Sequence, residues 1–360
     1  MGSSLKFAYS LSSPQGYLRP QVFVLFMQEL QTQAARITSL EIQGATNIAL
    51  FAIKIFDEFV QRHKDETPAK LWRMVREAED VLKKSRSTEP TLRNGLLYII
   101  GKVREHKKNG EKPVPIARHI HQYAEEYVKR LHGAKDEIAK IGAKRIPHDP
   151  VEHFTVMTHC HSSIVEAILI EAHKQGRKFD VICTETRPKF QGRITAKVLS
   201  EAGIKVQMVV DSAMRWAVKN REVAMIIIGA DAITSEGTVM NKIGSRLLAL
   251  VAEEENIPFY VASPLFKYNL GTLTGELEKI EKRESNEVWS EKETLHLGTR
   301  PKNIEILNPA FETVNRKYID GIICEVGLFP PDHTHLMFEK SYPFLVEGSK
   351  ACDDEYEGWE

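Results

Sequence analysis

A cysteine between two histidines is the feature of this chain best suited to chemistry. The stretch MTHCHS, residues 157–162, follows a short apolar run and precedes an apolar-periodic segment that predicts a helix. Cys160 is therefore expected at the carboxyl end of a strand, beside a helix amino terminus, where open α/β sheets bind ligands. That helix end and a nearby cationic histidine would both lower the pKa of the thiol. A buried structural cysteine is the alternative.

Two further predicted strands end in acidic or basic side chains. Glu185 and Arg187 follow one of them, and the guanidinium fork of Arg187 suits phosphate or carboxylate, although a structural Glu185–Arg187 pair accounts for them equally well. Asp231 follows the apolar run that ends at Ile228. It could bind a ligand, bind a metal or act as a general acid, whereas capping a turn is the simpler role.

Two lysines lie in comparable places. Asn241 and Lys242 precede the expected start of a helix, where backbone N–H groups and an ammonium group could bind an anion. Lys267 follows another strand, and solvated lysines are the alternative at both positions. Glycine-rich nucleotide motifs are missing, and no second carboxylate or histidine cluster accompanies Asp231, so neither a cofactor nor a metal is predicted. A thiol and a carboxylate in an anion-binding crevice suit proton transfer beside a carbonyl, as in sugar isomerisation.

The elements that must position these residues change in character along the chain. Residues 1–20 read as an irregular extension, and residues 21–145 show apolar side chains at helical spacing, which predicts five or six helices. Residues 146–340 alternate Val- and Ile-rich runs with helical patterns, which predicts an α/β fold with a doubly wound, mostly parallel sheet. The stretch from residue 276 to 299 reads as a charged surface excursion, and residues 341–360 as an acidic tail.

Composition excludes several classes of protein. Of 360 residues, 49 are Lys or Arg and 49 are Asp or Glu, so a uniformly basic surface for nucleic acid is not expected. The four cysteines are scattered without CxxC spacing, which argues against zinc and against a disulfide framework. With no secretory signal and no apolar run of membrane-spanning length, the sequence predicts a cytoplasmic protein that has no membrane partner.

Six motifs occur in one order: MTHCHS, TETRPKFQGRITAK, GADAIT, NKIG, FKYN and NPAFETV. Together they resemble the family that contains archaeal ribose-1,5-bisphosphate isomerase, methylthioribose-1-phosphate isomerase and the regulatory subunits of translation initiation factor two-B. The resemblance spans about residues 37–331. It implies a helical amino-terminal domain, a Rossmann-like catalytic domain, homo-oligomers from dimer to hexamer, and AMP as an effector.

The resemblance also implies a catalytic pair, which Cys160 and Asp231 match and which the regulatory subunits commonly lack. The implied reaction converts ribose 1,5-bisphosphate to ribulose 1,5-bisphosphate in nucleoside salvage. We expect protonated Asp231 to open the sugar ring and the Cys160 thiolate to remove the proton from carbon 2; a hydride shift is the alternative. The expected substrate-binding residues are Gly44, Ala45, Arg86, Arg93, His161, Ser162, Ser163, Arg187, Asn241, Lys242 and Lys267.

Three positions depart from the family pattern. Gln43 stands in place of an arginine before Gly44, Glu89 in place of the arginine of an Arg-Pro-Thr motif, and Ser163 in place of a lysine. A carboxylate at Glu89 and a substrate phosphate about 4 Å apart would repel each other by about 4 kcal/mol at an effective dielectric near 20. Either Arg86 or Arg93 supplies the missing charge, or the substrate is another sugar phosphate. The non-enzymatic alternative is a regulatory subunit that senses a sugar phosphate or a nucleotide.

Overall fold

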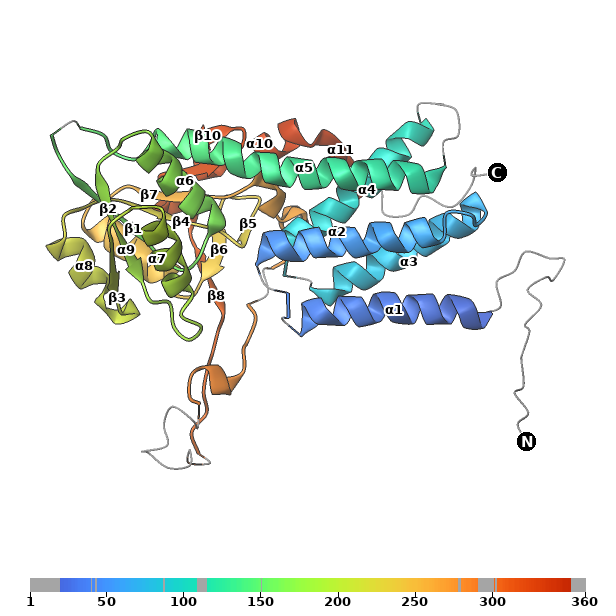
Figure 1. Cartoon of the computed structure of the whole chain (residues 1–360), viewed down its shortest axis with the longest axis horizontal. Coiled ribbons are helices and arrows are strands. Elements are labelled where there is room, and N and C mark those ends of the chain that lie inside the picture. The colour runs from blue at the N-terminus through green and yellow to red at the C-terminus, as the bar shows by residue number, and fades with distance from the viewer. Residues whose placement is uncertain are drawn as a thin grey trace, which may run out of the picture.

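The computed structural model describes residues 20–39, 41–42, 44–86, 88–108, 115–149, 151–277, 280–290, 301 and 303–350. Within these ranges the amino-terminal half contains five helices, which agrees with the five or six predicted. They are α1 (Pro20–Thr38), α2 (Ala45–Arg62), α3 (Pro68–Ser85), α4 (Pro90–Lys108) and α5 (Ile116–Ala143). Helix α5 runs along both halves of the molecule (Figure 1).

Local sequence explains where these helices begin and which face they bury. Pro68 and Pro90 are the first residues of α3 and α4, a position where proline is favoured because the first-turn N–H groups have no helical partner. On α2 the buried residues Ile48, Ala52 and Phe56 recur every four positions, so one stripe of the helix faces the core.

The carboxy-terminal half is built on a seven-stranded sheet of the order β10-β9-β7-β4-β1-β2-β3 in the described chain. Adjacent strands of this sheet are parallel except for β9 and β10, which confirms the predicted doubly wound, mostly parallel sheet. The strands are β1 (Phe154–Thr158), β2 (Phe179–Thr184), β3 (Val206–Val209), β4 (Val223–Ile228), β7 (Phe259–Ala262), β9 (Gly321–Cys324) and β10 (Gly327–Phe329).

Helices cover both faces of this sheet (Figure 1). They are α6 (Ser163–Lys174), α7 (Gln191–Glu201), α8 (Met214–Asn220) and α9 (Ser245–Glu254). Two further helices, α10 (Thr334–Ser341) and α11 (Pro343–Lys350), follow near the carboxyl end, where α11 packs against α4. Successive residues of β4 point to opposite faces. Ile226 and Ile228 join a core with the amino-terminal helices, α8 and α9, whereas Met225 and Ile227 join a second core with α6, α7 and the end of α5.

A small antiparallel sheet of order β5-β6-β8 was not predicted. Its strands are β5 (Ala232–Ile233), β6 (Val239–Lys242) and β8 (Phe311–Val314). Asn241 and Lys242 therefore end β6 and, as expected, directly precede the helix that begins at Ser245. The N–H of Asp231 donates to the carbonyl of Met240 at 2.8 Å. The polar side chains at the end of β6 concealed this strand, because they interrupt the apolar run expected of a buried one.

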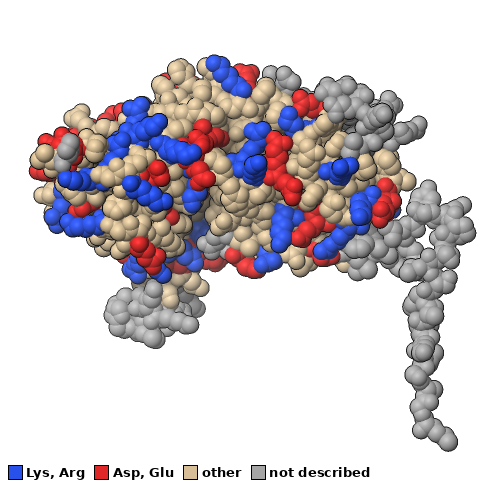
Figure 2. Space-filling view, turned by 45° about the horizontal axis from the view of Figure 1, so that its top comes forward, with Lys and Arg blue, Asp and Glu red and all other residues tan. Residues whose placement is uncertain are grey.

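The surface agrees with the balanced composition. Basic and acidic side chains are interspersed over the face that Figure 2 shows, without a large region of one sign. In the described ranges no helix combines the length and the apolar character required to cross a bilayer.

Candidate functional site

The candidate site lies where the strand order reverses. The chain begins the sheet at β1, proceeds outward through β2 to β3, and then returns to β4 on the other side of β1. Ligands of open α/β sheets bind at such a switch point, outside the carboxyl ends of the strands. Cys160 follows β1 and Asp231 follows β4, so the predicted pair lies on neighbouring strands.

The loops after β1 and β4 touch. A Cβ added at Gly229 would lie 2.7 Å from Ser162 Oγ, so only glycine allows this approach. The charges of Lys242 and Asp231 both act on the pKa of the Cys160 thiol. The structure thus brings Cys160, Asp231 and Lys242 into one site.

The backbone of Cys160 is held in an unusual conformation. Its φ angle is 69°, in the left-handed region that residues other than glycine rarely adopt. Its N–H donates to Thr186 Oγ1 at 3.0 Å, and its carbonyl accepts from Thr195 Oγ1 at 3.3 Å. Surrounding structure must hold such a conformation, and here the loop after β2 and helix α7 do so.

The expectation of a lowered thiol pKa is wrong. Burial raises the pKa of Cys160 to about 12, and the carboxylates of Asp231 and Asp211 add to the effect while Lys242 opposes it. His159 is no cation, because burial lowers its pKa. Its ring contacts Thr184 Oγ1 at 2.6 Å and the carbonyl of Ile243 at 2.8 Å. The thiol is therefore protonated in this site at neutral pH.

The residues after Cys160 serve local structure. His161 Nδ1 lies 2.9 Å from Glu166 Oε1, and Ser162 caps α6 by accepting the N–H of Val165 at 3.4 Å. Ser163 is the first residue of α6 and is exposed. A contact of these three residues with substrate stays a prediction.

Arg187 is directed away from Glu185. Its guanidinium donates to the carbonyl of Val288 at 3.1 Å, and its backbone N–H donates to Asp211 at 2.7 Å. Glu185 pairs with Arg193 at 3.2 Å instead, so the Glu185–Arg187 pair considered from sequence is not formed.

Two lysines lie close to the predicted pair. Lys267 donates to the carbonyl of Ala230, the residue before Asp231. Lys242 is 6% exposed, so a solvated lysine is wrong at this position, and its ammonium group lies 4.8 Å from the centre of the Phe311 ring. The neighbouring Asn241 side chain is buried and donates to Ser245 Oγ at 2.9 Å.

The anion site expected on backbone N–H groups at the start of α9 is already filled by a side chain. Glu312 Oε1 of β8 accepts the N–H groups of Gly244 and Arg246 at 2.6 and 3.0 Å. A carboxylate is a suitable partner for a helix amino terminus, because that end carries partial positive charge. An anionic substrate would have to displace it.

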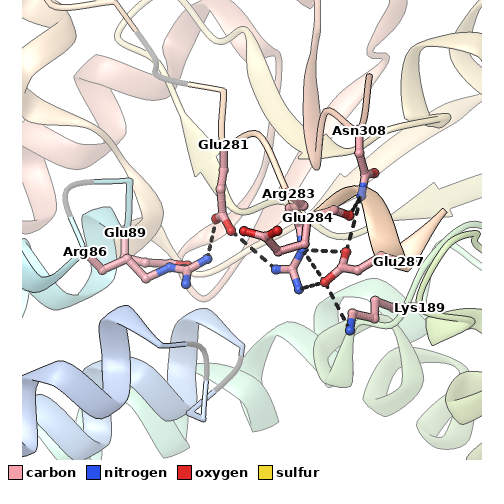
Figure 3. A network of polar contacts seen from close by, with 8 residues as sticks. All are labelled: Arg86, Glu89, Lys189, Glu281, Arg283, Glu284, Glu287 and Asn308. Atoms are coloured by element: carbon pink, nitrogen blue, oxygen red, sulfur yellow. Dashed lines mark hydrogen bonds and ion pairs between the residues drawn. The ribbon is translucent and has the colours of Figure 1, made fainter. Parts of the chain in front are cut away.

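Arg86 is held between two carboxylates (Figure 3). Its Nε lies 3.2 Å from Glu89 Oε1, and its Nη2 lies 2.7 Å from Glu281 Oε2. The side chain is 10% exposed. Arg86 is therefore neutralised by its neighbours and does not supply a spare positive charge.

Glu281 belongs to a segment that we call the strap, residues 280–290. Figure 3 shows its side chains extending the network from Arg86 towards Lys189. Arg283 contacts Glu281 at 3.3 Å and Glu287 at 2.6 Å, and Glu287 contacts Lys189 at 3.1 Å. Arg283 and Glu287 are each 12% exposed. The described part of the predicted surface excursion contains no buried residue and projects from the body of the molecule (Figure 1), while its ion pairs connect it to Arg86 and Lys189. Residues 291–300 lie outside the described ranges.

Arg93 and Gly44, two of the other expected binding residues, contact residues other than Cys160 and Asp231. Arg93 donates to Asn269 Oδ1 at 3.0 Å and lies 3.9 Å from Glu276. Gly44 has a φ angle of 86° and caps α2, whose first residue is Ala45. A role for them in substrate binding stays a prediction, and Gln43 lies outside the described residues.

Glu89 lies close enough to this site for the charges of Asp231 and Lys267 to act on its carboxyl group. It is 3% exposed, and burial and the charge of Asp231 raise its pKa to about 7, against the effects of Arg86 and Lys267. Sequence reasoning treated Glu89 only as a lost positive charge. Its burial could not be foreseen from residues 86–93 alone.

Thr186 and Asp211 were also missed as parts of the site. Asp211 follows β3, so its place at a strand end was the available signal. Its carboxylate accepts the N–H of Thr186 at 2.8 Å, and Thr186 holds the Cys160 N–H. In the described ranges no group of three or more His, Cys, Asp or Glu side chains is arranged to bind a metal.

Replacing Thr186 by valine is expected to lower kcat by about tenfold and to destabilise the protein by about 1–3 kcal/mol, because the buried Cys160 N–H loses its partner. Thr186→Ser keeps the hydroxyl group and is the control. Steady-state kinetics and urea unfolding check both effects. A valine variant as active and as stable as the serine variant would contradict this role for the hydrogen bond.

The fold and site define a class of protein: a Rossmann-like α/β domain with an amino-terminal helical bundle and a thiol–carboxylate pair at the switch point. The model of the initiation factor 2 subunit family matches residues 41–331, and the chain belongs to this family.

Two kinds of relative are similar to it. Ribose 1,5-bisphosphate isomerase of Archaeoglobus fulgidus is 38% identical over 86% of this chain and 93% of its own. Among solved structures, 5-methylthioribose 1-phosphate isomerase of Pyrococcus horikoshii has a TM-score of 0.67 and 26% identity over 87% of this chain and 88% of its own. The translation initiation factor eIF-2B of that organism has a TM-score of 0.64 and 27% identity over 87% of this chain and 98% of its own.

Proposed function

We propose that this protein is an aldose–ketose isomerase that converts ribose 1,5-bisphosphate to ribulose 1,5-bisphosphate, with Cys160 and Asp231 as its acid–base pair. The observation that carries the proposal is the position of this pair after β1 and β4, at the switch point of the sheet. The similarity to the archaeal isomerase over most of both chains supports the choice of substrate.

Burial raises the pKa of the Cys160 thiol, so the proposed reaction begins with a proton on this sulfur. Breaking the S–H bond and forming an O–H bond on Asp231 creates an acid and a thiolate base without changing net charge. Asp231 then donates its proton to the ring oxygen as the ring opens. The thiolate takes the proton from carbon 2, which gives an enediol-type intermediate. The Cys160 thiol then returns this proton to carbon 1, while the hydroxyl group on carbon 2 gives its proton to Asp231, so the ketose forms and the starting thiolate and protonated Asp231 are restored. Binding of substrate phosphate near Lys242 and Lys267 places the sugar between the two groups.

A coupled assay for ketose formation from ribose 1,5-bisphosphate, with and without AMP, tests the proposal. We expect turnover by the wild-type protein, and stimulation if AMP is an effector. A folded protein that binds this sugar phosphate without turnover would overturn the proposal that it is an isomerase and would support the regulatory alternative. Turnover of another sugar phosphate only would keep an isomerase and replace its substrate.

We also propose that the chain forms homo-oligomers. Trp216 on α8 and Leu247 and Leu250 on α9 are exposed by 53, 50 and 41%, and these two helices pack together. Exposed apolar side chains on adjoining helices are typical of protein interfaces. Sedimentation equilibrium of wild type and Trp216→Glu measures the assembly; a monomeric wild type would contradict it.

A further inference from the structure

Glu89 is a buried titratable group that the proposed acid–base chemistry does not use. Its Oε1 accepts from Arg86 Nε at 3.2 Å, whereas its Oε2 has no hydrogen-bond partner among the described residues. Leaving a buried polar atom without a hydrogen bond costs free energy, so such atoms are rare and need an explanation. If the atom lies in a ligand site, a hydrogen bond with the bound ligand explains why it has no partner in the free protein.

The structure holds Glu89 firmly at this place. Glu89 immediately precedes α4, and Asn94 in the first turns of α4 donates to the carbonyls of Phe266 and Tyr268, both at 2.8 Å. Lys267 lies between those two residues. The amino end of α4 is therefore fixed against the loop that carries one of the expected phosphate-binding lysines.

The charged groups around Glu89 come from four elements. Arg86 lies at the end of α3, Lys267 on the loop after β7, and Asp231 on the loop after β4. Glu281 of the strap holds the other side of Arg86. Because burial and Asp231 raise the pKa of Glu89 to about 7, about half of the molecules carry a neutral carboxylic acid here at neutral pH.

We propose that Glu89 binds the sugar and not a phosphate: as the protonated acid, its Oε2 donates a hydrogen bond to a hydroxyl group of the sugar phosphate. The inference rests on the proposed function and names the part of the substrate that the amino end of α4 recognises. A carboxylate here would repel a phosphate. The phosphate groups are then bound by Lys242 and Lys267, and the arginine that the resemblance implies at position 89 is not required.

The proposal predicts a dependence of KM on pH. Only the protonated form of Glu89 binds substrate, so KM is expected to rise by about tenfold for each pH unit above the pKa of Glu89. Glu89→Gln has a neutral donor of similar shape at every pH, so its KM is expected to keep only the shallow dependence that the substrate phosphates themselves cause. The effect of the variant is expected as a flattened pH profile of KM and not as a loss confined to kcat.

We would measure kcat and KM from pH 6 to 8.5 for wild type, Glu89→Gln and Glu276→Gln. The last variant removes an exposed carboxylate near Arg93 and serves as the control. Its profile is expected to follow wild type. Parallel KM profiles of wild type and Glu89→Gln, or a loss confined to kcat, would overturn the proposal.

Calorimetry on the wild-type protein gives a second readout, which does not require turnover or a folded variant. Titrating ribose 1,5-bisphosphate at pH 8 in buffers of different ionisation enthalpy measures proton uptake, which is expected to approach one proton per site. Uptake with a pH-dependent Kd but no turnover would keep this proposal and overturn the proposed isomerase. Binding without proton uptake would overturn the role of Glu89 while leaving the isomerase in place, and no binding would overturn both.

Discussion

Cys160→Ser and Asp231→Asn are each expected to lower kcat for ribose 1,5-bisphosphate by about 10²–10⁴-fold, the usual contribution of a positioned acid or base. The hydroxyl group of serine is a far weaker acid than a thiol, so it does not form the anion that must receive the proton of carbon 2. Asparagine cannot donate the proton that opens the ring. KM is expected to change by only a few-fold in both variants, because neither group is expected to bind the phosphates.

The two variants also test how the groups act on each other. The Asp231 charge is one of the causes that raise the pKa of Cys160, so Asp231→Asn should lower this pKa. Thiolate absorbance as a function of pH measures the shift, with Cys160→Ser subtracted as the background. Cys183→Ala is the matched control for kinetics, since Cys183 is a buried thiol within β2. Activity of Cys160→Ser within tenfold of wild type would contradict a thiol base.

Glu89→Gln is expected to stabilise the protein relative to wild type by about 3 kcal/mol more at pH 8 than at pH 4.5. The pKa of Glu89 is raised from 4.5 to about 7 in the folded protein, so the native state binds a proton more tightly than the unfolded state. Between these two pH values the native state holds more protons, and the free energy of unfolding therefore falls as pH rises. Stability that is complete below pH 4.5 is lost as the pH passes through about 7.

Urea unfolding of both proteins at several pH values measures this effect, and the difference between them isolates Glu89 from all other titrating groups. Glu276→Gln, with an exposed side chain, should show almost no pH-dependent difference from wild type. A difference between Glu89→Gln and wild type that is the same at pH 5 and pH 8 would mean that Glu89 is not a destabilised buried acid. The role proposed for it in binding would then lose its physical basis.

Much of the fold follows from the sequence because the signals are local and repeated. Helical spacing in the amino-terminal half and the apolar runs such as residues 225–228 depend on neighbours a few positions away. The alternation of strands and helices then favours a doubly wound sheet, and the ends of its strands indicate where Cys160 and Asp231 should meet. The short antiparallel strands β5, β6 and β8 lacked such a pattern and were missed.

The protonation and pairing of the site were decided by tertiary structure alone. The sequence showed histidines beside Cys160, yet burial and the charges of Asp231 and Asp211 raise the thiol pKa. Burial also lowers the pKa of His159, so this ring does not supply the expected positive charge. Arg86 was a candidate anion binder, but Glu281, 195 residues away along the chain, pairs with it. The sequence indicated only that Glu89 replaces a positive charge, whereas the structure buries its carboxyl group and raises its pKa. Desolvation and long-range pairing depend on which distant segments pack together, and local sequence does not contain that information.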